Sequence, residues 1–332
     1  MPARTRLDLV FFDPSAERAR RLDARMRERL GESLRYVVGQ AAEHLPIPTA
    51  ALDDFFARLK SGPVGPQAFG AYFDLVLAIE ADALDEAAAR LAEIVAQPKP
   101  GPGLRVVDLA DPARDAPSDR YCRQVDTDPT APFEILPPPP ALAAACRRRI
   151  DEAFALLDAG NPALGAEIRG LVREIVLAVG PSGPGAVVFD GASSFMLWGA
   201  VVLNAASHET PLAMLQALAH ESGHNLLFGL AADGPLVENP DDERYASPLR
   251  ADPRPLDGIF HATFVLARMH QALARLRDAG VLAGADLEEA DAALAWCSRL
   301  FADGLGTVER HARLTPMGAA VLAGARDYMA SV

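Results

Sequence analysis

Hydrophobic and polar residues recur with helical spacing over most of the first half of the chain. Residues 15–32 mix Arg, Glu, Leu and Ala in the manner of a surface helix, and Phe55 and Phe56 are core candidates of a second helix. The pattern predicts helices over residues 15–32, 49–60, 139–158 and 163–179, and a helical pair over 68–96 that is broken near Ala81-Asp82.

Short apolar runs that are rich in branched and aromatic residues predict a small number of strands. One strand is expected over 104–109, after a loop at 97–103 that is rich in Pro and Gly. Two more are expected over 186–189 and 195–203. A second linker is expected over about 126–140.

The second half of the chain contains a well-marked helix start. Thr210 has the properties of an N-cap and Pro211 suits the first helical position, so a helix should run from there to near Gly229. The loop of about 27 residues over 230–256 is too long for a simple connector and is a candidate for function. Further helices are expected over 257–279 and 286–304, with a last one from Thr315-Pro316.

These patterns predict a predominantly helical α+β protein. We expect a mainly helical N-terminal region over residues 1–180, with a possible role in peptide recognition. Residues 181–332 are expected to form a metal-binding catalytic region, in which a small sheet precedes a zincin-like helix.

Composition narrows the function classes. Half of the 332 residues are apolar and 23% are charged, which is typical of a globular protein. The formal net charge of −13 argues against general binding to nucleic acid or to anionic membrane, since both require clustered Lys and Arg. Cys122, Cys146 and Cys297 form no CxxC pair, and no run approaches a membrane span, so we expect a reduced, cytoplasmic protein.

The sequence His220-Glu221-Ser222-Gly223-His224 is a candidate metal motif. Histidines four residues apart on a helix project from one face, so their imidazoles can converge on one ion. Glu221 is placed to move a proton on a metal-bound water or to orient a ligand. Ser222 and Gly223 are small, and we expect them to leave space above the ion.

A mononuclear site needs a third protein ligand. The downstream candidates are Glu238, Glu243, His261 and His270. We favour His261, near the start of the next predicted helix, over a loop carboxylate, although Glu238 and Glu243 stay open. His270 follows His261 by nine residues and should fall on the opposite side of that helix.

Three arginines are candidates to hold a carboxylate near this site. Arg250 and Arg254 belong to the proline-stiffened loop, and Arg268 should share a helix face with His261. A guanidinium suits bidentate binding of a carboxylate. The alternative for the two loop arginines is pairing with Asp241, Asp242 or Asp252.

Several segments together resemble a known family. They are Phe195-Met196-Leu197-Trp198-Gly199, Leu203-Asn204, 215–229, Ser247-Pro248-Leu249-Arg250, Asp252-Pro253-Arg254-Pro255, 258–268 and Leu314-Thr315-Pro316-Met317-Gly318, with a looser match at Phe69-Gly70-Ala71-Tyr72-Phe73. The chain resembles the HExxH-motif proteins encoded with ribosomally synthesised peptide natural products.

The resemblance implies an iron(II)- and 2-oxoglutarate-dependent dioxygenase that hydroxylates a precursor peptide at a β-carbon. It implies His220, His224 and His261 as iron ligands, and one of Arg250, Arg254 and Arg268 on the 2-oxoglutarate carboxylate. Zinc could replace iron on isolation. The precursor peptide is the expected partner, and the oligomeric state is open.

Two other interpretations remain. The five-residue motif alone also fits a zinc peptidase, in which Glu221 acts as the general base. A peptide-binding protein without activity is the third interpretation, and the intact set of histidines and arginines argues against it.

Overall fold

The computed structural model describes residues 7–46, 48–125, 134–181, 189–250 and 252–332. The protein is predominantly helical and contains a small mixed sheet, in agreement with the predicted class. It divides into two compact units. The first unit comprises residues 1–19, 148–168 and 208–332, and the second comprises residues 20–147 and 169–207.

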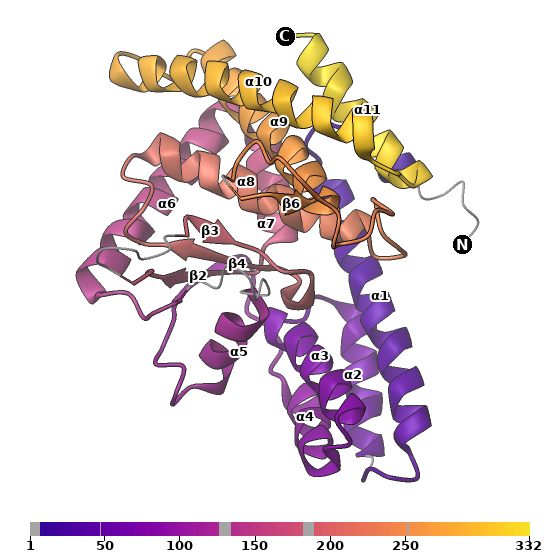
Figure 1. Ribbon diagram of the computed structural model, residues 1–332. Coiled ribbons are helices and arrows are strands. Elements are labelled where there is room, and N and C mark those ends of the chain that lie inside the picture. The colour runs from indigo at the N-terminus through magenta and orange to yellow at the C-terminus, as the bar shows by residue number, and fades with distance from the viewer. Residues whose placement is uncertain (1–6, 47, 126–133, 182–188, 251) are drawn as a thin grey trace. The chain divides into compact units, whose positions relative to one another are not determined.

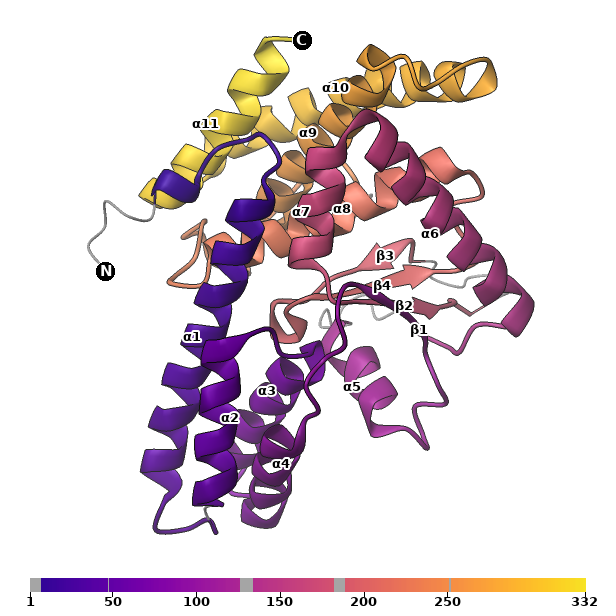
Figure 2. The ribbon, with the colours of Figure 1, turned by 180° about the vertical axis from the view of Figure 1, so that it is seen from behind.

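Four helices run alongside one another in the second unit, as Figures 1 and 2 both show. They are α1 (Ala16–Ala41, which enters this unit at Arg20), α2 (Thr49–Ser61), α3 (Pro66–Glu80) and α4 (Leu84–Ala96). The break near Ala81-Asp82 is confirmed, and Asp82 there has a left-handed φ of 56°. Helix α1 extends well beyond the predicted end at residue 32.

The sheet of the second unit has the strand order β1-β2-β4-β3. Strands β1 (Arg105–Asp108), β2 (Glu174–Ala178) and β4 (Ala200–Asn204) are parallel, and β3 (Gly191–Ala192) is antiparallel to β4. Every residue of β2 and β4 is buried, as is usual for parallel strands. The strand expected over 104–109 is therefore confirmed as β1.

Strand β2 corrects the helix predicted over 163–179. Helix α7 (Pro162–Leu171) ends early, and the following apolar run pairs with β1 and β4 instead. A short buried apolar run has the same local pattern in a strand and in a helix, so only its long-range pairing decides.

The strand predicted over 195–203 is also only partly correct. Its first residues form the 3-10 helix η3 (Phe195–Leu197), and β4 begins at Ala200. Of the strand expected over 186–189, residues 186–188 lie outside the described residues.

An unpredicted helix, α5 (Ala116–Val125), contributes to the core beside the sheet. Tyr121 of α5 packs with Val176 of β2, Val202 of β4 and Leu197 of η3. Its hydroxyl also donates a hydrogen bond to Glu174. The second unit is thus a helical group joined in sequence to a small buried sheet.

The first unit is built mainly from long helices. They are α6 (Pro140–Gly160, in this unit from Arg148), most of α7, α8 (Pro211–Leu230), α9 (Leu256–Asp278), α10 (Ala285–His311) and α11 (Pro316–Ala330). Between α8 and α9 the chain forms a two-stranded hairpin of β5 (Arg244–Tyr245) and β6 (Arg254–Pro255). Helix α9 packs against α8, α10 and α11 and carries the largest buried face of the unit.

The two units do not coincide with the predicted division at residue 180. Residues 169–207 join the second unit because β2 and β4 pair with β1. Residues 1–19 and 148–168 join the first unit, where Arg18 and Glu167 form a buried ion pair.

Within the described residues, no helix is long and apolar enough to cross a membrane.

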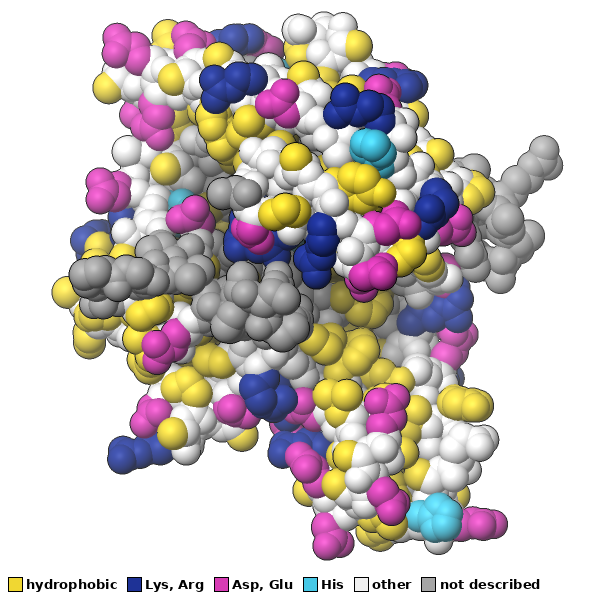
Figure 3. All heavy atoms as spheres, viewed as in Figure 1, with side chains coloured by type: hydrophobic (Ala, Val, Ile, Leu, Met, Phe, Trp, Pro, Cys, Tyr) yellow, Lys and Arg dark blue, Asp and Glu magenta, His cyan; other side chains and the backbone are white. Residues whose placement is uncertain are grey.

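Acidic and basic side chains are interspersed over the coloured part of the face in Figure 3.

Candidate metal centre

Helix α8 positions the two histidines of the motif. The Thr210 hydroxyl accepts a hydrogen bond from the Ala213 amide at 2.9 Å, and Pro211 occupies the first turn, so the predicted helix start is confirmed. The Thr210 hydroxyl also donates to Glu289 of α10 at 2.7 Å. The start of α8 is therefore fixed by local capping and by a tertiary contact.

His220, His224 and His261 form a group that we call the histidine cluster. The Nε2 atoms of His220 and His224 lie 3.1 Å apart, and the Nδ1 atoms of His224 and His261 lie 3.0 Å apart. Two residues come from α8 and one from α9, which pack against each other (Figure 1). Tertiary packing thus brings the preferred third histidine to the motif.

The two neighbours of His224 face different nitrogens of its ring. Nδ1 and Nε2 flank the same ring carbon, and each faces one of the other histidines. As the side chains stand, no group of three or more His, Cys, Asp or Glu residues in the described part of the chain is arranged to hold a metal ion. His224 presents a different nitrogen to each neighbour, whereas one ion would require a single nitrogen from each ring.

Taken one pair at a time, the nitrogen separations are those of two ligands on one ion. Two nitrogens bound to one ion at about 2.1 Å lie roughly 3.0 to 3.4 Å apart, from octahedral to tetrahedral angles. The observed separations of 3.0 and 3.1 Å are at the octahedral end of that range.

The protonation state also suits metal binding. Burial, followed by the proximity of His220 and His261, lowers the pKa of His224 well below 6.5. Burial lowers the pKa of His261 as well, although Asp257 opposes that effect. Neutral imidazoles are the form that coordinates metals, so both rings are suited to ligation near pH 7.

Glu221 lies beside the cluster and is only 4% exposed. One of its carboxylate oxygens is 3.9 Å from His220 Nε2. A buried carboxylate at this distance can orient a ligand or exchange a proton with a group bound beside His220.

Gly223 has a different role from the one predicted. A Cβ atom at this position would lie 2.9 Å from Cγ1 of Val265 on α9, which is closer than real Cβ contacts. The glycine therefore permits the close approach of α8 and α9 that brings His261 to the motif. Ser222 is buried too, and its hydroxyl donates to the Ala219 carbonyl at 3.3 Å.

The loop carboxylates that were alternative ligands are placed elsewhere. Glu243 accepts hydrogen bonds from Asn239 at 2.9 Å, Tyr245 at 3.1 Å and Arg313 at 3.3 Å. Glu238 is exposed, and its backbone amide donates to the Arg313 carbonyl. His261 is accordingly the downstream candidate that contacts the motif.

His270 faces a different element from His261. Its Nδ1 lies 2.9 Å from the hydroxyl of Tyr328 on α11. The prediction that the two histidines of α9 diverge agrees with this placement.

Arg268 belongs to a buried ion cluster. It donates to Glu167 and, at 2.8 Å, to the Phe12 carbonyl, and its side chain is 1% exposed. Arg18 binds the same carboxylate through Nε at 3.1 Å. We call Arg18, Glu167 and Arg268 the glutamate cluster. Its internal pairing disfavours Arg268 as a ligand-binding arginine.

Arg250 and Arg254 both face Asp252, as the alternative interpretation of the loop allowed. Their Nε atoms lie 3.5 and 2.8 Å from its carboxylate oxygens. The Arg250 side chain is 46% exposed and that of Arg254 is 17% exposed. Arg254 also lies at the start of α9, with its Cβ 3.9 Å from the position of a Cβ at Gly258. Arg254 is therefore the more buried of the two loop arginines.

Sequence reasoning did not identify Asp257 as part of this site. Its carboxylate lies 3.9 Å from His261 Nε2, one helical turn earlier on α9. The spacing Asp-x-x-x-His could have indicated this contact from the sequence, because residues four apart share a helix face.

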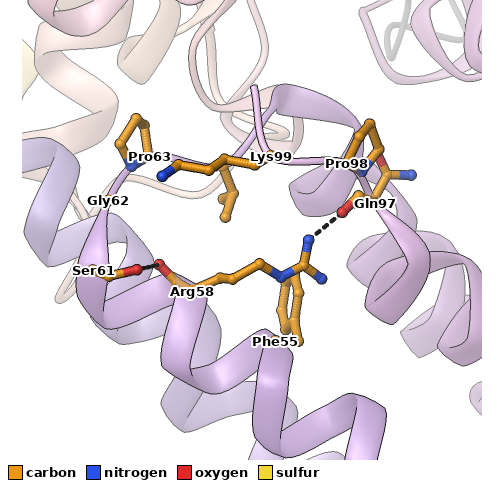
Figure 4. Close-up of a pocket in the computed structure, with 9 residues that line it drawn as sticks. Phe55, Arg58, Ser61, Gly62, Pro63, Gln97, Pro98 and Lys99 are labelled. Atoms are coloured by element: carbon orange, nitrogen blue, oxygen red, sulfur yellow. Dashed lines mark hydrogen bonds between the residues drawn. The ribbon is translucent and has the colours of Figure 1, made fainter. Parts of the chain in front are cut away.

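The second unit contains a separate cavity of about 60 Å³. Figure 4 shows the Arg58 guanidinium directed toward the Gln97 carbonyl, to which it donates. Arg58 also donates to the Val95 carbonyl at 2.6 Å and lies over the Phe55 ring. These contacts join α2 to the end of α4, and the cavity lining contains none of the predicted site residues.

Comparison of the sequence with known proteins identifies no family for this chain. No protein-family model matches the sequence, and no curated protein matches it either.

Proposed function

We propose that this chain is an iron(II)- and 2-oxoglutarate-dependent oxygenase that hydroxylates a β-carbon in a ribosomally synthesised precursor peptide. The observation that carries the proposal is the histidine cluster, in which α9 supplies a histidine rather than a glutamate next to the motif. The motif helix of such a site would resemble that of zincins, whereas its third ligand would be a histidine. A cytoplasmic location is part of the same proposal.

His220, His224 and His261 would hold the iron, and the pairwise nitrogen separations and the lowered pKa values of His224 and His261 support that assignment. Three protein ligands leave positions for a bidentate cosubstrate and for oxygen. When bound, iron(II) and 2-oxoglutarate supply the oxidation that turns a C–H bond and O₂ into C–OH, with release of succinate and CO₂.

Arg254 would bind the distal carboxylate of 2-oxoglutarate. Its partner Asp252 is 47% exposed, so an incoming carboxylate can compete for the guanidinium without removing a buried charge. The same exchange at Arg268 would break a fully buried pair with Glu167. The relative cost favours Arg254, with Arg250 as the second choice.

The decisive experiment loads anaerobic protein with iron(II) and titrates 2-oxoglutarate while visible absorption is recorded. We expect a weak, saturable charge-transfer band that is lost in His261→Ala. His270→Gln is the matched control on the same helix, and it should retain the band because His270 contacts Tyr328. No band in the wild type, together with tightly retained zinc, would contradict the proposal.

A zinc peptidase is the second candidate, and the position of Glu221 favours it. The buried carboxylate 3.9 Å from His220 Nε2 is suited to a general base. Glu221→Gln should lower peptidase turnover by about 10²- to 10⁴-fold, the usual contribution of general acid–base catalysis. An oxygenase should retain most of its turnover, so product analysis of the wild type and of Glu221→Gln separates the two functions.

A further inference from the structure

We propose that Asp257 is a positioning residue that fixes the His261 imidazole with Nδ1 available to the metal. The inference rests on the proposed function, because it concerns the third ligand of that site. Asp257 Oδ2 lies 3.9 Å from His261 Nε2, and Nδ1 of the same ring lies 3.0 Å from His224 Nδ1. The two nitrogens of His261 thus face different groups.

The tautomer of the imidazole determines which of its nitrogens can bind a metal. A neutral imidazole carries one proton, so Nδ1 can donate its lone pair to a metal only when Nε2 holds the hydrogen. A carboxylate facing Nε2 stabilises that tautomer by accepting the N–H. Asp257 is therefore placed on the nitrogen that must be protonated, while His224 lies at the nitrogen that must be free.

The side chain of Asp257 has the freedom to complete this contact. It is 53% exposed, and its 3.9 Å separation from His261 Nε2 is longer than a hydrogen bond. The competing explanation is that Asp257 only stabilises the start of α9, because an acid in the first turn favours the helix dipole. Asp286 occupies the equivalent place in α10 and provides the matched control.

The first test reads the tautomer in metal-free protein. We would label histidine with ¹⁵N and record long-range ¹H–¹⁵N spectra above pH 7, with His261→Asn to assign the signal. We expect the Nε2–H tautomer in the wild type and in Asp286→Ala. Asp257→Ala should give a mixture, whereas Asp257→Asn should largely retain the wild-type state because its amide oxygen still accepts.

The second test measures metal affinity by competition with a chelator. Asp257→Ala should weaken binding by about 10- to 100-fold, the usual cost of losing a carboxylate behind a metal-bound histidine. Asp257→Asn should lose less, and Asp286→Ala should match the wild type. Circular dichroism on each variant establishes that α9 remains folded.

The outcomes separate the two levels of inference. An unchanged tautomer and affinity in Asp257→Ala overturn the positioning role, and so does an equal loss in Asp286→Ala. A wild-type protein that binds no metal overturns the proposed function, while the tautomer of His261 still decides whether Asp257 directs the ring.

Discussion

Helix α9 carries two polar clusters of opposite character. At Arg268 the glutamate cluster places full charges inside the first unit, where its three side chains are each about 1% exposed and the Glu167 carboxylate pairs with both guanidinium groups. At His261 the histidine cluster joins three imidazole rings whose nitrogens face one another, with His220 25% exposed and His261 12% exposed. Removing one member of a buried, internally paired cluster destabilises the fold, whereas a partly open cluster of like donors is suited to an external ligand.

The largest expected effect comes from removing a central histidine. His224→Ala should reduce metal affinity by more than about 100-fold, beyond the loss typical of groups that only support a ligand. Metal content after dialysis, measured by elemental analysis, checks this. Stoichiometric retention of metal by the folded variant would show that the histidine cluster is not the metal site.

The opposite result is expected at the glutamate cluster. Glu167→Ala leaves Arg18 and Arg268 buried without their shared partner, so the free energy of unfolding should fall by about 3 to 5 kcal/mol. Urea unfolding measures the change. Glu152→Ala, at an exposed position of α6, is the control and should change stability by less than about 0.5 kcal/mol.

A Glu167→Ala variant with lower metal affinity and unchanged stability would contradict this distinction between the two clusters. In that case the glutamate cluster would belong to the site rather than to the framework.

An intermediate effect is expected at the loop arginines. Arg254→Ala should raise the 2-oxoglutarate concentration for half-saturation by about 10- to 100-fold, as lost charge-assisted hydrogen bonds imply. The titration of the visible band measures it at constant iron. Arg250→Ala should have a smaller effect because its side chain is more exposed. A larger shift in Arg250→Ala than in Arg254→Ala would reverse the assignment.

The smallest effect concerns the second histidine of α9. Burial, followed by the charge of Arg277, lowers the pKa of His270 below 6.5, so the unfolded chain binds a proton there more readily than the folded protein does. The contribution to stability is present above pH 6.5 and is lost as pH falls below that value. One such group changes the free energy of unfolding by less than about 1.4 kcal/mol per pH unit.

His270→Gln should therefore flatten the pH dependence of stability between pH 7.5 and 5.5. Urea unfolding of metal-free protein at several pH values measures the slope. An identical slope in both proteins would indicate that His270 is equally protonated in the folded and unfolded chains.

Local sequence determined a large part of the structure. Helical periodicity located α2, α3, α4, α6 and α8 to α11, and the Thr210-Pro211 signal marked the start of α8 because capping acts within one turn. Thr315-Pro316 acted in the same way for α11, with the Thr315 hydroxyl accepting from the Gly318 amide at 3.1 Å. The i, i+4 spacing likewise put His220 and His224 on one face before any tertiary contact was known.

Only the tertiary structure decided the rest. The buried run of β2 is a strand because β1 and β4 pair with it, which no local pattern encodes. Gly223 serves the approach of α9 rather than space above an ion, and Arg268 pairs with a glutamate from α7. The sequence therefore indicated which residues are candidates for metal and ligand binding. Long-range packing determined which of them meet, because side-chain partners distant in sequence are selected by the fold rather than by their neighbours along the chain.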